Sequence, residues 1–222
     1  MSINLRIFSL ISVLLGGAAL LSSADRRLPA DNQGYEPEQP IAFSHRVHAG
    51  ELGMQCQYCH FGARQSRHAG VPPASTCMNC HRIVTSSFNA KQMAKEAAEA
   101  ANREPEEVIS TELKKLYDAL GLDSERNPIP GTEQKPIEWV RVHNLPDFVY
   151  FDHRPHVARQ IACETCHGPV QSMDRMRQHA PLSMGWCIDC HRANALTSAG
   201  GVQSGGERVA DHVSTNCVTC HL

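Results

Sequence analysis

The chemically distinctive residues of this chain are its ten cysteines, all of which lie in copies of the pentapeptide Cys-x-x-Cys-His. In that spacing two thiols can add to the vinyl groups of a haem, and the histidine that follows can bind its iron. The sequence therefore predicts five covalently bound haem c groups, with the motif histidines as proximal iron ligands. The five copies are motif 1 (Cys56, Cys59, His60), motif 2 (Cys77, Cys80, His81), motif 3 (Cys163, Cys166, His167), motif 4 (Cys187, Cys190, His191) and motif 5 (Cys217, Cys220, His221).

Zinc sites and thiol redox enzymes also use Cys-x-x-Cys, and both are alternatives to haem. A zinc site needs no histidine directly after the second cysteine, and a thioredoxin-like chain carries one motif in a βαβ unit. No cysteine is left over for a disulfide or a catalytic thiol. Five motifs without a stray cysteine favour haem attachment over both alternatives.

A haem iron with one protein ligand is open to substrates, whereas a second His or Met makes it a low-spin electron carrier. Eight histidines lie outside the motifs, more than five irons need. An i, i+3 pair on a helical turn puts both imidazoles on one face, so each can serve a different haem. The predicted second ligands are His45, His48, His143, His153 and His156. Further candidates are Met184, Met173, His68, His179 and His212, for which surface exposure or packing is the competing interpretation.

The chain contains an internal duplication. Phe43–His48 (FSHRVH) recurs as Phe151–His156 (FDHRPH), and each copy is followed by two haem motifs. The chain is thus expected to form two dihaem modules and a C-terminal fifth haem. The expected divisions are an N-terminal segment (1–24), a first dihaem module (25–85), a helical linker (86–138), a second dihaem module (139–196) and a strap with the fifth haem (197–222).

The linker predicts two helices. Residues 90–103 are rich in alanine and charge, which indicates a solvated helix. A second, amphipathic helix is expected to begin at Pro105 and to end at Gly121. This pair either packs on the haem core or docks a partner. Elsewhere short helices around the motifs and long loops are expected, so the fold class is mostly α with extensive loops, organised by haem.

Composition limits what the polypeptide can do alone. Only 5% of the 222 residues are aromatic, and the mean hydropathy is −0.34. Haem faces would supply the missing apolar surface, so we expect little stable fold without haem. The net charge is −2 and no basic run is present, which argues against nucleic-acid binding.

The N-terminal 24 residues support two interpretations. Arg6, the apolar stretch from Ile7 to Leu21 and small residues at Ser22 and Ala24 are typical of a cleavable secretory signal. Counted from Ile3, the same stretch approaches the roughly 20 residues of a membrane-spanning helix. Both interpretations place the haem motifs outside the cytoplasm.

The histidine segments combined with Cys-x-x-Cys-His resemble the class III multihaem cytochromes. The longer stretch from Trp139 to Arg192, with VRVHNLPDFVYFDHRPH, ACETCHGPV and PLSMGWCIDCHR, is similar to the pentahaem cytochrome c subunit of alternative complex III, a bacterial quinol:electron-acceptor oxidoreductase. The similarity covers nearly everything from Ile41 to the end of the chain, including all five motifs, and is weaker in the alanine-rich helix and the glycine-rich strap. It implies the five predicted histidine ligands, with Met184 as a candidate for one iron. It also implies a periplasmic haem domain on one N-terminal transmembrane helix.

The partners that this resemblance implies are three: an iron–sulfur subunit, a quinol-oxidising membrane subunit, and a monohaem cytochrome subunit. The leading hypothesis is therefore an electron-transfer subunit without a catalytic site of its own, passing electrons to a cytochrome c or a terminal oxidase. The alternatives are a free periplasmic carrier and a multihaem reductase acting on a nitrogen or sulfur oxyanion. Because only Leu222 follows His221, the fifth haem is expected near the surface or a subunit interface.

Overall fold

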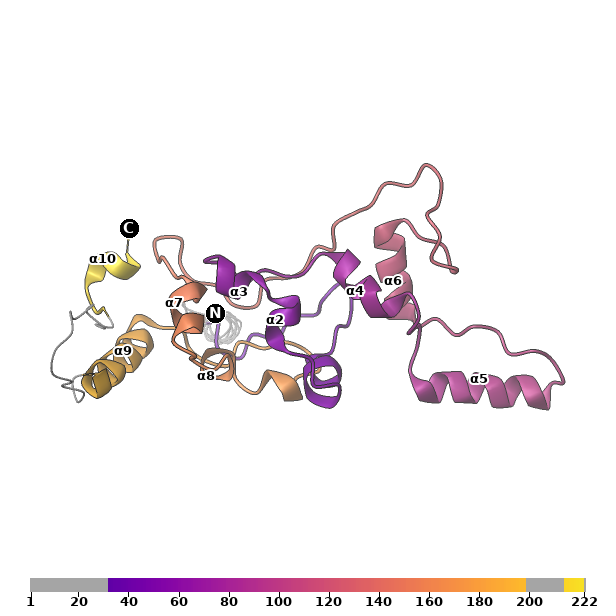
Figure 1. Cartoon of the computed structure of the whole chain (residues 1–222), viewed down its shortest axis with the longest axis horizontal. Helices are drawn as coiled ribbons and strands as arrows, with labels where there is room; N and C mark the ends of the chain where they lie inside the picture. Colours follow the sequence, from indigo (N-terminus) through magenta and orange to yellow (C-terminus); the bar gives the residue numbers. More distant parts are fainter. Residues whose placement is uncertain (1–31, 199–213, 222) are drawn as a thin grey trace, which may run out of the picture. The chain divides into compact units, whose positions relative to one another are not determined.

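The computed structural model describes residues 32–198 and 214–221 (Figure 1). Their secondary structure is helical, and β-structure among them is limited to two isolated bridges. This confirms the expectation of a mostly helical fold with extensive loops. The helices are the π-helix η1 (Arg46–Glu51), α2 (Cys56–Cys59), α3 (Gly62–Gln65), α4 (Ala74–His81), α5 (Phe88–Ala100), α6 (Thr111–Leu120), α7 (His153–Ala158), α8 (Glu164–His167), the 3-10 helix η2 (Val170–Ser172), α9 (Met184–Ser198) and α10 (Cys217–Cys220).

The chain divides into two compact units. The larger comprises residues 34–143 and 150–180 and contains motifs 1, 2 and 3. The smaller includes the described residues 144–149, 181–198 and 214–221 and contains motifs 4 and 5. The proposed division into successive modules along the chain stays a prediction, since each unit is assembled from discontinuous segments.

The main apolar cluster of the larger unit holds motif 2 in place. Met78 on α4 packs against Leu116 and Tyr117 on α6, and all three side chains are buried. The hydroxyl of Tyr117 also donates a hydrogen bond of 2.6 Å to the carbonyl oxygen of His81. Helix α6 therefore holds in place both α4, which carries motif 2, and the proximal histidine of that motif.

Helix α6 begins later than the sequence indicated. The expected start at Pro105 is wrong, because Ser110 is the N-cap and its hydroxyl accepts a hydrogen bond from the Leu113 amide. The segment between α5 and α6 returns to Thr85, a fully buried residue that precedes α5. The carbonyl of Thr85 accepts a hydrogen bond from the Ser110 amide. The expected end is confirmed: Gly121 adopts φ 67°, a left-handed conformation typical of a helix C-terminus.

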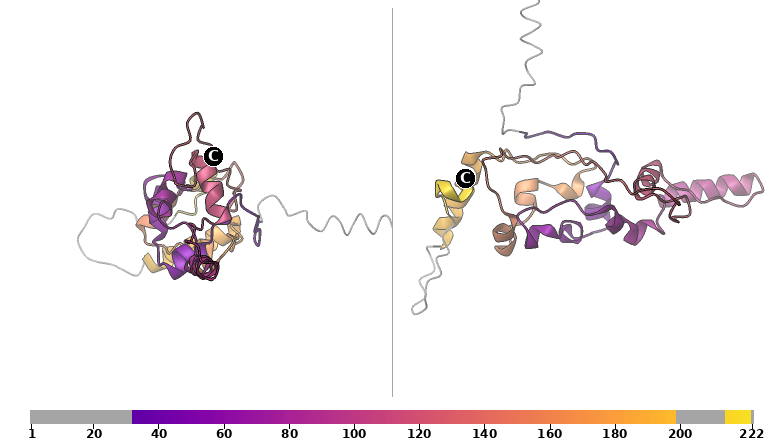
Figure 2. Two further views of the ribbon diagram at one scale, coloured as in Figure 1. Left: turned by 90° about the vertical axis from the view of Figure 1, so that its right-hand side faces the viewer. Right: turned by 90° about the horizontal axis from the view of Figure 1, so that it is seen from above.

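Helix α5 confirms the predicted solvated helix, shifted slightly towards the N-terminus. It extends away from the rest of its unit (Figures 1 and 2), and of its side chains only Ala98 is buried. Ser87 caps its first turn by accepting a hydrogen bond from the Ala90 amide. Local capping and alanine content, more than packing, therefore stabilise this helix.

The duplicated histidine segment forms a short helix in both copies, η1 in the first and α7 in the second. Helix η1 packs closely on η2 at Gly50, where an added Cβ would overlap the carbonyl oxygen of Gln171. A glycine is required there by close backbone approach. The two copies thus share a position in the chain but differ in helical geometry.

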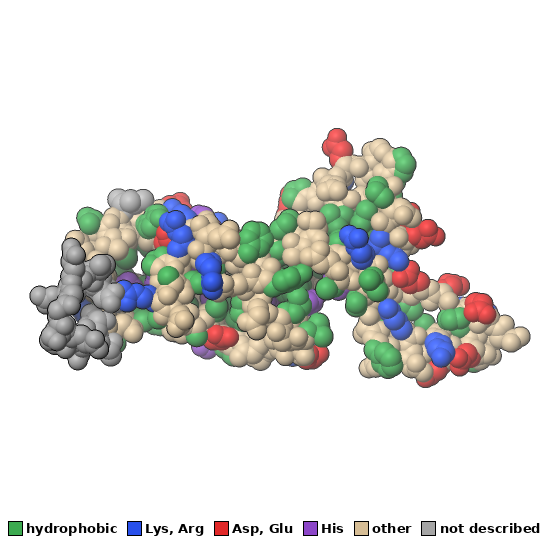
Figure 3. Space-filling model, in the orientation of Figure 1, with side chains coloured by type: hydrophobic (Ala, Val, Ile, Leu, Met, Phe, Trp, Pro, Cys, Tyr) green, Lys and Arg blue, Asp and Glu red, His purple; other side chains and the backbone are tan. Residues whose placement is uncertain are grey.

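Large apolar side chains remain exposed close to the haem motifs, and hydrophobic atoms reach the surface at several places in Figure 3. Phe61 beside motif 1 is 53% exposed, and Val218 inside motif 5 is 75% exposed. Such side chains leave apolar surface in contact with water unless another apolar group covers them. This pattern fits the expectation that haem completes the core.

Among the described residues, no helix has the length and apolar character needed to cross a membrane. The predicted N-terminal anchor, residues 1–24, lies outside the described part of the chain.

Removing the two serine caps should have different consequences. Ser110→Ala should weaken α6 by about 1 kcal/mol, and because α6 supports motif 2, amide exchange should accelerate about five-fold in α6 and α4 together. Ser87→Ala is the matched control and should accelerate exchange in α5 alone. Hydrogen–deuterium exchange mass spectrometry of the haem-loaded protein measures both, and unchanged exchange of α4 in Ser110→Ala would contradict the coupling.

Candidate haem-binding site

Each haem motif is built on a single helical turn. In motifs 1, 3 and 5 the amide of the histidine donates to the carbonyl of the first cysteine, at 2.8, 3.0 and 2.9 Å. A helical turn places residues i and i+3 on one side, so both cysteines of a motif lie next to each other. The local sequence thus forms the attachment geometry without long-range help.

In the larger unit, three motif histidines each face a predicted second ligand. The three ring pairs come from segments that are separate in the chain, and their ring centroids lie at closely similar distances. The pairs are His45–His60 at 6.4 Å, His153–His167 at 6.4 Å and His48–His81 at 6.1 Å.

This spacing fits one metal ion between two imidazoles. A ring nitrogen binds a metal at about 2.0–2.1 Å and the ring centroid lies roughly 1 Å behind that nitrogen, so two opposed ligands have centroids about 6 Å apart. The fit holds for all three pairs and is found on side chains that the sequence had singled out. The residues present therefore suit a haem iron with a histidine on each side.

Hydrogen bonds from the ring Nδ1–H orient most of these histidines. A backbone carbonyl can only accept, so each such contact places the proton on Nδ1 and leaves Nε2 available for iron. The bonds run from His48 to Ser44, from His60 to Gly70, from His81 to Val84, from His153 to Arg67, from His156 to Asp152 and from His191 to Ser214, at 2.6–2.9 Å.

Burial keeps three of the site histidines neutral. It is the main cause that lowers the pKa of His45 and of His143 to about 4, and the pKa of His167 to about 3, with nearby imidazoles adding to the effect. A ligating histidine must be unprotonated. These rings are therefore in the metal-binding form at neutral pH.

His143 is placed differently from the other predicted ligands. Its ring centroid lies 4.5 Å from that of His167 at an angle of 71°, which is too close for a metal between the two rings. His153, not His143, faces His167 across the iron-sized gap. The Nε2 atom of His143 is buried without a hydrogen-bond partner, and its role as a ligand of another iron stays a prediction.

The reserve candidates are scattered. His68 is exposed, and His179 packs against Gly168, where an added Cβ would overlap its ring. Met173 is buried, whereas Met184 at the start of α9 is 66% exposed. His212 lies outside the described residues. The ligand roles of these side chains stay predictions.

Phenylalanines support the histidines, a feature that sequence reasoning missed. Phe43 lies 5.0 Å from His45 and 4.3 Å from His48 between ring centroids, and Phe151 contacts both histidines of the second copy at similar distances. The Phe at the start of each duplicated segment was the available signal. In the smaller unit Phe148 lies 5.8 Å from His221, without a comparable sequence signal.

The attachment cysteines show which haems are neighbours. Burial raises the pKa of Cys163, and the adjacent thiol of Cys56, to which it is hydrogen-bonded, raises it further. Burial likewise raises the pKa of Cys59, with smaller effects from Cys56 and from Cys80 of motif 2. Motif 1 therefore lies between motifs 2 and 3. In the smaller unit, Cys220 of motif 5 similarly adds to the burial that raises the pKa of Cys187 of motif 4.

Two parts of the chain match known cytochrome families. Residues 149–222 match cytochrome c7 and related cytochromes c, and residues 22–110 match the class III cytochrome c family. Over these two regions the chain is similar to multihaem cytochromes c. A relative in Nitratidesulfovibrio vulgaris, named as the multihaem cytochrome c subunit of a menaquinone reductase, is 26% identical over 176 residues, which cover 70% of this chain and 69% of the relative. The family matches imply covalent c-type haems, as the motifs predicted.

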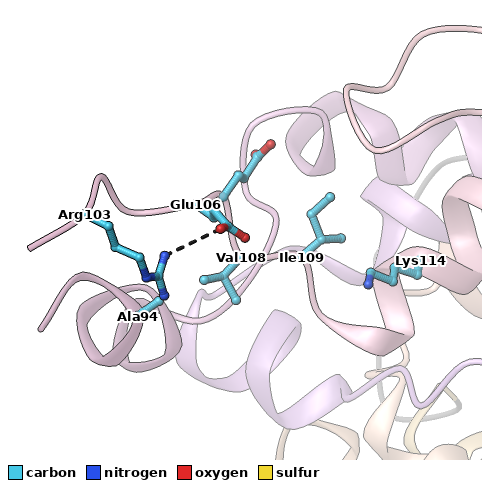
Figure 4. A pocket seen from close by; sticks show the side chains of 7 residues that line it. Ala94, Arg103, Glu106, Val108, Ile109 and Lys114 are labelled. Atoms are coloured by element: carbon cyan, nitrogen blue, oxygen red, sulfur yellow. Dashed lines mark ion pairs between the residues drawn. The ribbon is translucent and has the colours of Figure 1, made fainter. Parts of the chain in front are cut away.

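The larger unit also has a pocket of about 310 Å³ whose lining contains no residue of a haem motif (Figure 4). It lies between α5 and the start of α6, next to an ion pair of 3.5 Å between Arg103 and Glu106. Its rim carries Lys114 and Glu107 as well, so charges of both signs are mixed. No residue of the histidine pairs lines this pocket, and the haem chemistry stays with those pairs.

The two copies of the histidine segment obtain a carboxylate in different ways. In the second copy Asp152 caps α7 and pairs with Arg154, which lowers the pKa of Asp152 to about 2. In the first copy Ser44 occupies the equivalent position, and the carboxylate is that of Asp174. It accepts from the Ser44 hydroxyl at 2.7 Å and from Arg46 Nε at 3.0 and 3.1 Å.

Removing the Asp174 carboxylate should loosen the first histidine segment. The ion pair is solvent-exposed, so Asp174→Asn should weaken the segment only modestly. Binding of carbon monoxide to ferrous haem requires release of a distal histidine, so it should become faster by roughly two- to five-fold. Stopped-flow spectroscopy measures this rate.

Ser44→Asp in the same protein supplies a carboxylate two residues before the arginine, as in the second copy, and should restore the slow rate. A rate unaffected by Asp174→Asn, or a defect that Ser44→Asp leaves in place, would show that the carboxylate does not position this segment.

Proposed function

We propose that this cytochrome binds five haem c groups and acts as the electron-transfer subunit of a membrane complex that exchanges electrons with quinones. When bound, haem iron supplies a one-electron ferric/ferrous couple. The observation that carries the proposal is the set of three histidine pairs with centroids 6.1–6.4 Å apart. Closing both axial positions with histidine favours conduction over substrate binding.

The chain's own residues have separable roles in this function. The motif cysteines attach the haems, and the Nδ1–H hydrogen bonds hold Nε2 of each histidine towards the iron. His156 is proposed to serve a haem as His48 does, by the duplication of its segment and by the matching bond to Asp152 O. His143 and Met184 remain the proposed ligands for irons that these pairs do not serve.

Two lines of similarity support the quinone-linked setting. The named relative is a subunit of a menaquinone reductase, and the stretch from Trp139 to Arg192 resembles the pentahaem cytochrome c of alternative complex III, a complex that oxidises quinol. The more specific proposal is the latter assembly, with iron–sulfur, quinol-oxidising and monohaem cytochrome partners. The haem domain would lie on the extracytoplasmic side, held by residues 1–24 as a membrane anchor.

Haem stoichiometry tests the site. The intact protein should have the mass of the polypeptide plus five haems, because each motif supplies a complete pair of thiols. Cys217→Ala/Cys220→Ala should carry four, with the spectrum of the other haems preserved. Denaturing mass spectrometry counts them, since thioether bonds survive unfolding, and fewer than five haems in the unaltered protein would overturn the proposed count.

Quinone linkage is tested on gently solubilised membranes. A short-chain menaquinol added without oxygen should reduce the haems of the intact complex, and an oxidised cytochrome c should then reoxidise them. The isolated haem-loaded chain is the control and should stay oxidised, since the proposal gives it no quinone site. Release of the cytochrome by an alkaline wash would favour the free carrier, and high-spin haem with nitrite- or sulfite-dependent shifts would favour the reductase.

A further inference from the structure

The three histidine pairs of the larger unit differ in the hydrogen bonds that their rings make. In the pair of motif 2, both rings donate from Nδ1 to a backbone carbonyl, His48 to Ser44 and His81 to Val84, each at 2.8 Å. In each of the other two pairs, one ring donates. The motif 2 position therefore has two carbonyl acceptors where its neighbours have one.

The pair of motif 1 shows the contrast directly. His60 donates to Gly70 O at 2.6 Å, but the Nδ1 atom of His45 is buried without a partner among the described residues. The acceptor is missing on the ring that the duplication aligns with His153, which does donate to Arg67 O.

The pair of motif 3 has its single bond on the opposite ring. His153 donates to the carbonyl of Arg67 at 2.7 Å, and the described structure gives His167 no ring hydrogen bond of this kind. His167 is instead surrounded by other imidazoles, those of His143 and His153. The histidine pairs of motifs 1 and 3 thus have one carbonyl acceptor each, whereas the pair of motif 2 has two.

An imidazole whose Nδ1–H donates to a carbonyl is a more basic ligand. Stronger donation to iron stabilises the ferric state over the ferrous state and lowers the reduction potential.

Resting on the proposed function, we propose that His48 and His81 give the haem of motif 2 the lowest reduction potential of the three in this unit. Because motif 1 lies between motifs 2 and 3, electrons supplied by a one-electron donor at motif 2 would run downhill into the unit once the haems are bound. Each transfer would move one electron from a ferrous to a ferric iron, with no bond made or broken. The low-potential end is the end supported by α6.

The angle between the rings of His48 and His81 should also give the motif 2 haem a distinct spectroscopic signal. The ring planes of His48 and His81 are inclined at 63°, whereas those of the other pairs lie at 9° and 10°. Ferric low-spin iron between nearly parallel imidazoles gives a rhombic electron paramagnetic resonance signal, and steeply inclined rings give a strongly anisotropic one. The motif 2 haem can therefore be followed separately in the unaltered protein.

The test is an anaerobic redox titration of the complete haem-loaded protein, monitored by electron paramagnetic resonance at low temperature. As the potential is lowered, the anisotropic signal of motif 2 should persist after both rhombic signals of motifs 1 and 3 have disappeared. His48→Met assigns the anisotropic signal by removing it, and the matched variants His45→Met and His153→Met each remove one rhombic signal. Loss of the anisotropic signal before either rhombic one would overturn the potential order.

Failure of the proposed function gives a different result. If the three methionine variants leave all signals in place, the histidine pairs do not ligate iron and the bis-histidine assignment itself is wrong. Should His48→Met fail to retain its haems by mass, nuclear magnetic resonance of the unaltered protein replaces it. Haem resonances with contacts to Met78 and Tyr117 identify motif 2, and their reduction before those of motifs 1 and 3 would equally overturn the order.

Discussion

The structure depends on pairs of imidazole rings that face each other across the width of one metal ion. Each pair joins a motif histidine to a histidine from another part of the chain, as His48 joins His81. Two imidazole rings have no reason of their own to face each other across such a gap, since neither ring gains a hydrogen bond or a packed face from the other. The backbone is therefore arranged around a group that binds both rings. The polypeptide's own apolar core, centred on Met78, Leu116 and Tyr117, is small beside it.

The duplicated Phe-x-His-x-x-His segment turns this pairing into a connection between haems. His45, the N-cap of η1, faces motif 1, and His48 within η1 faces motif 2, while Phe43 packs against both rings. A shift of this segment would displace two iron positions together. The i, i+3 spacing thus sets both the ligation and the proximity of adjacent haems, and proximity is what electron transfer requires.

Sequence reasoning found the parts of this site that are encoded locally. The cysteine motifs are contiguous, and the duplication exposed His45, His48 and His153, so spacing alone was informative. It placed the start of α6 at Pro105 because a proline signal was visible, whereas the buried hydrogen bonds at Thr85 that delay the helix to Ser110 involve a distant segment. The position of His143 relative to His167 also depends on tertiary packing, which no local pattern reports.

In the larger unit the two copies of the histidine segment support each other. The carbonyl of Arg67, which follows the first copy, accepts from both the amide and the ring of His153 in the second copy. Asp174, which follows the second copy, holds Arg46 and Ser44 in the first. Each copy thus completes the histidine segment of the other, and neither segment has its full set of partners alone. Because Cys56 of motif 1 and Cys163 of motif 3 are also in contact, these exchanged hydrogen bonds act together with that contact to hold the two motifs in one unit.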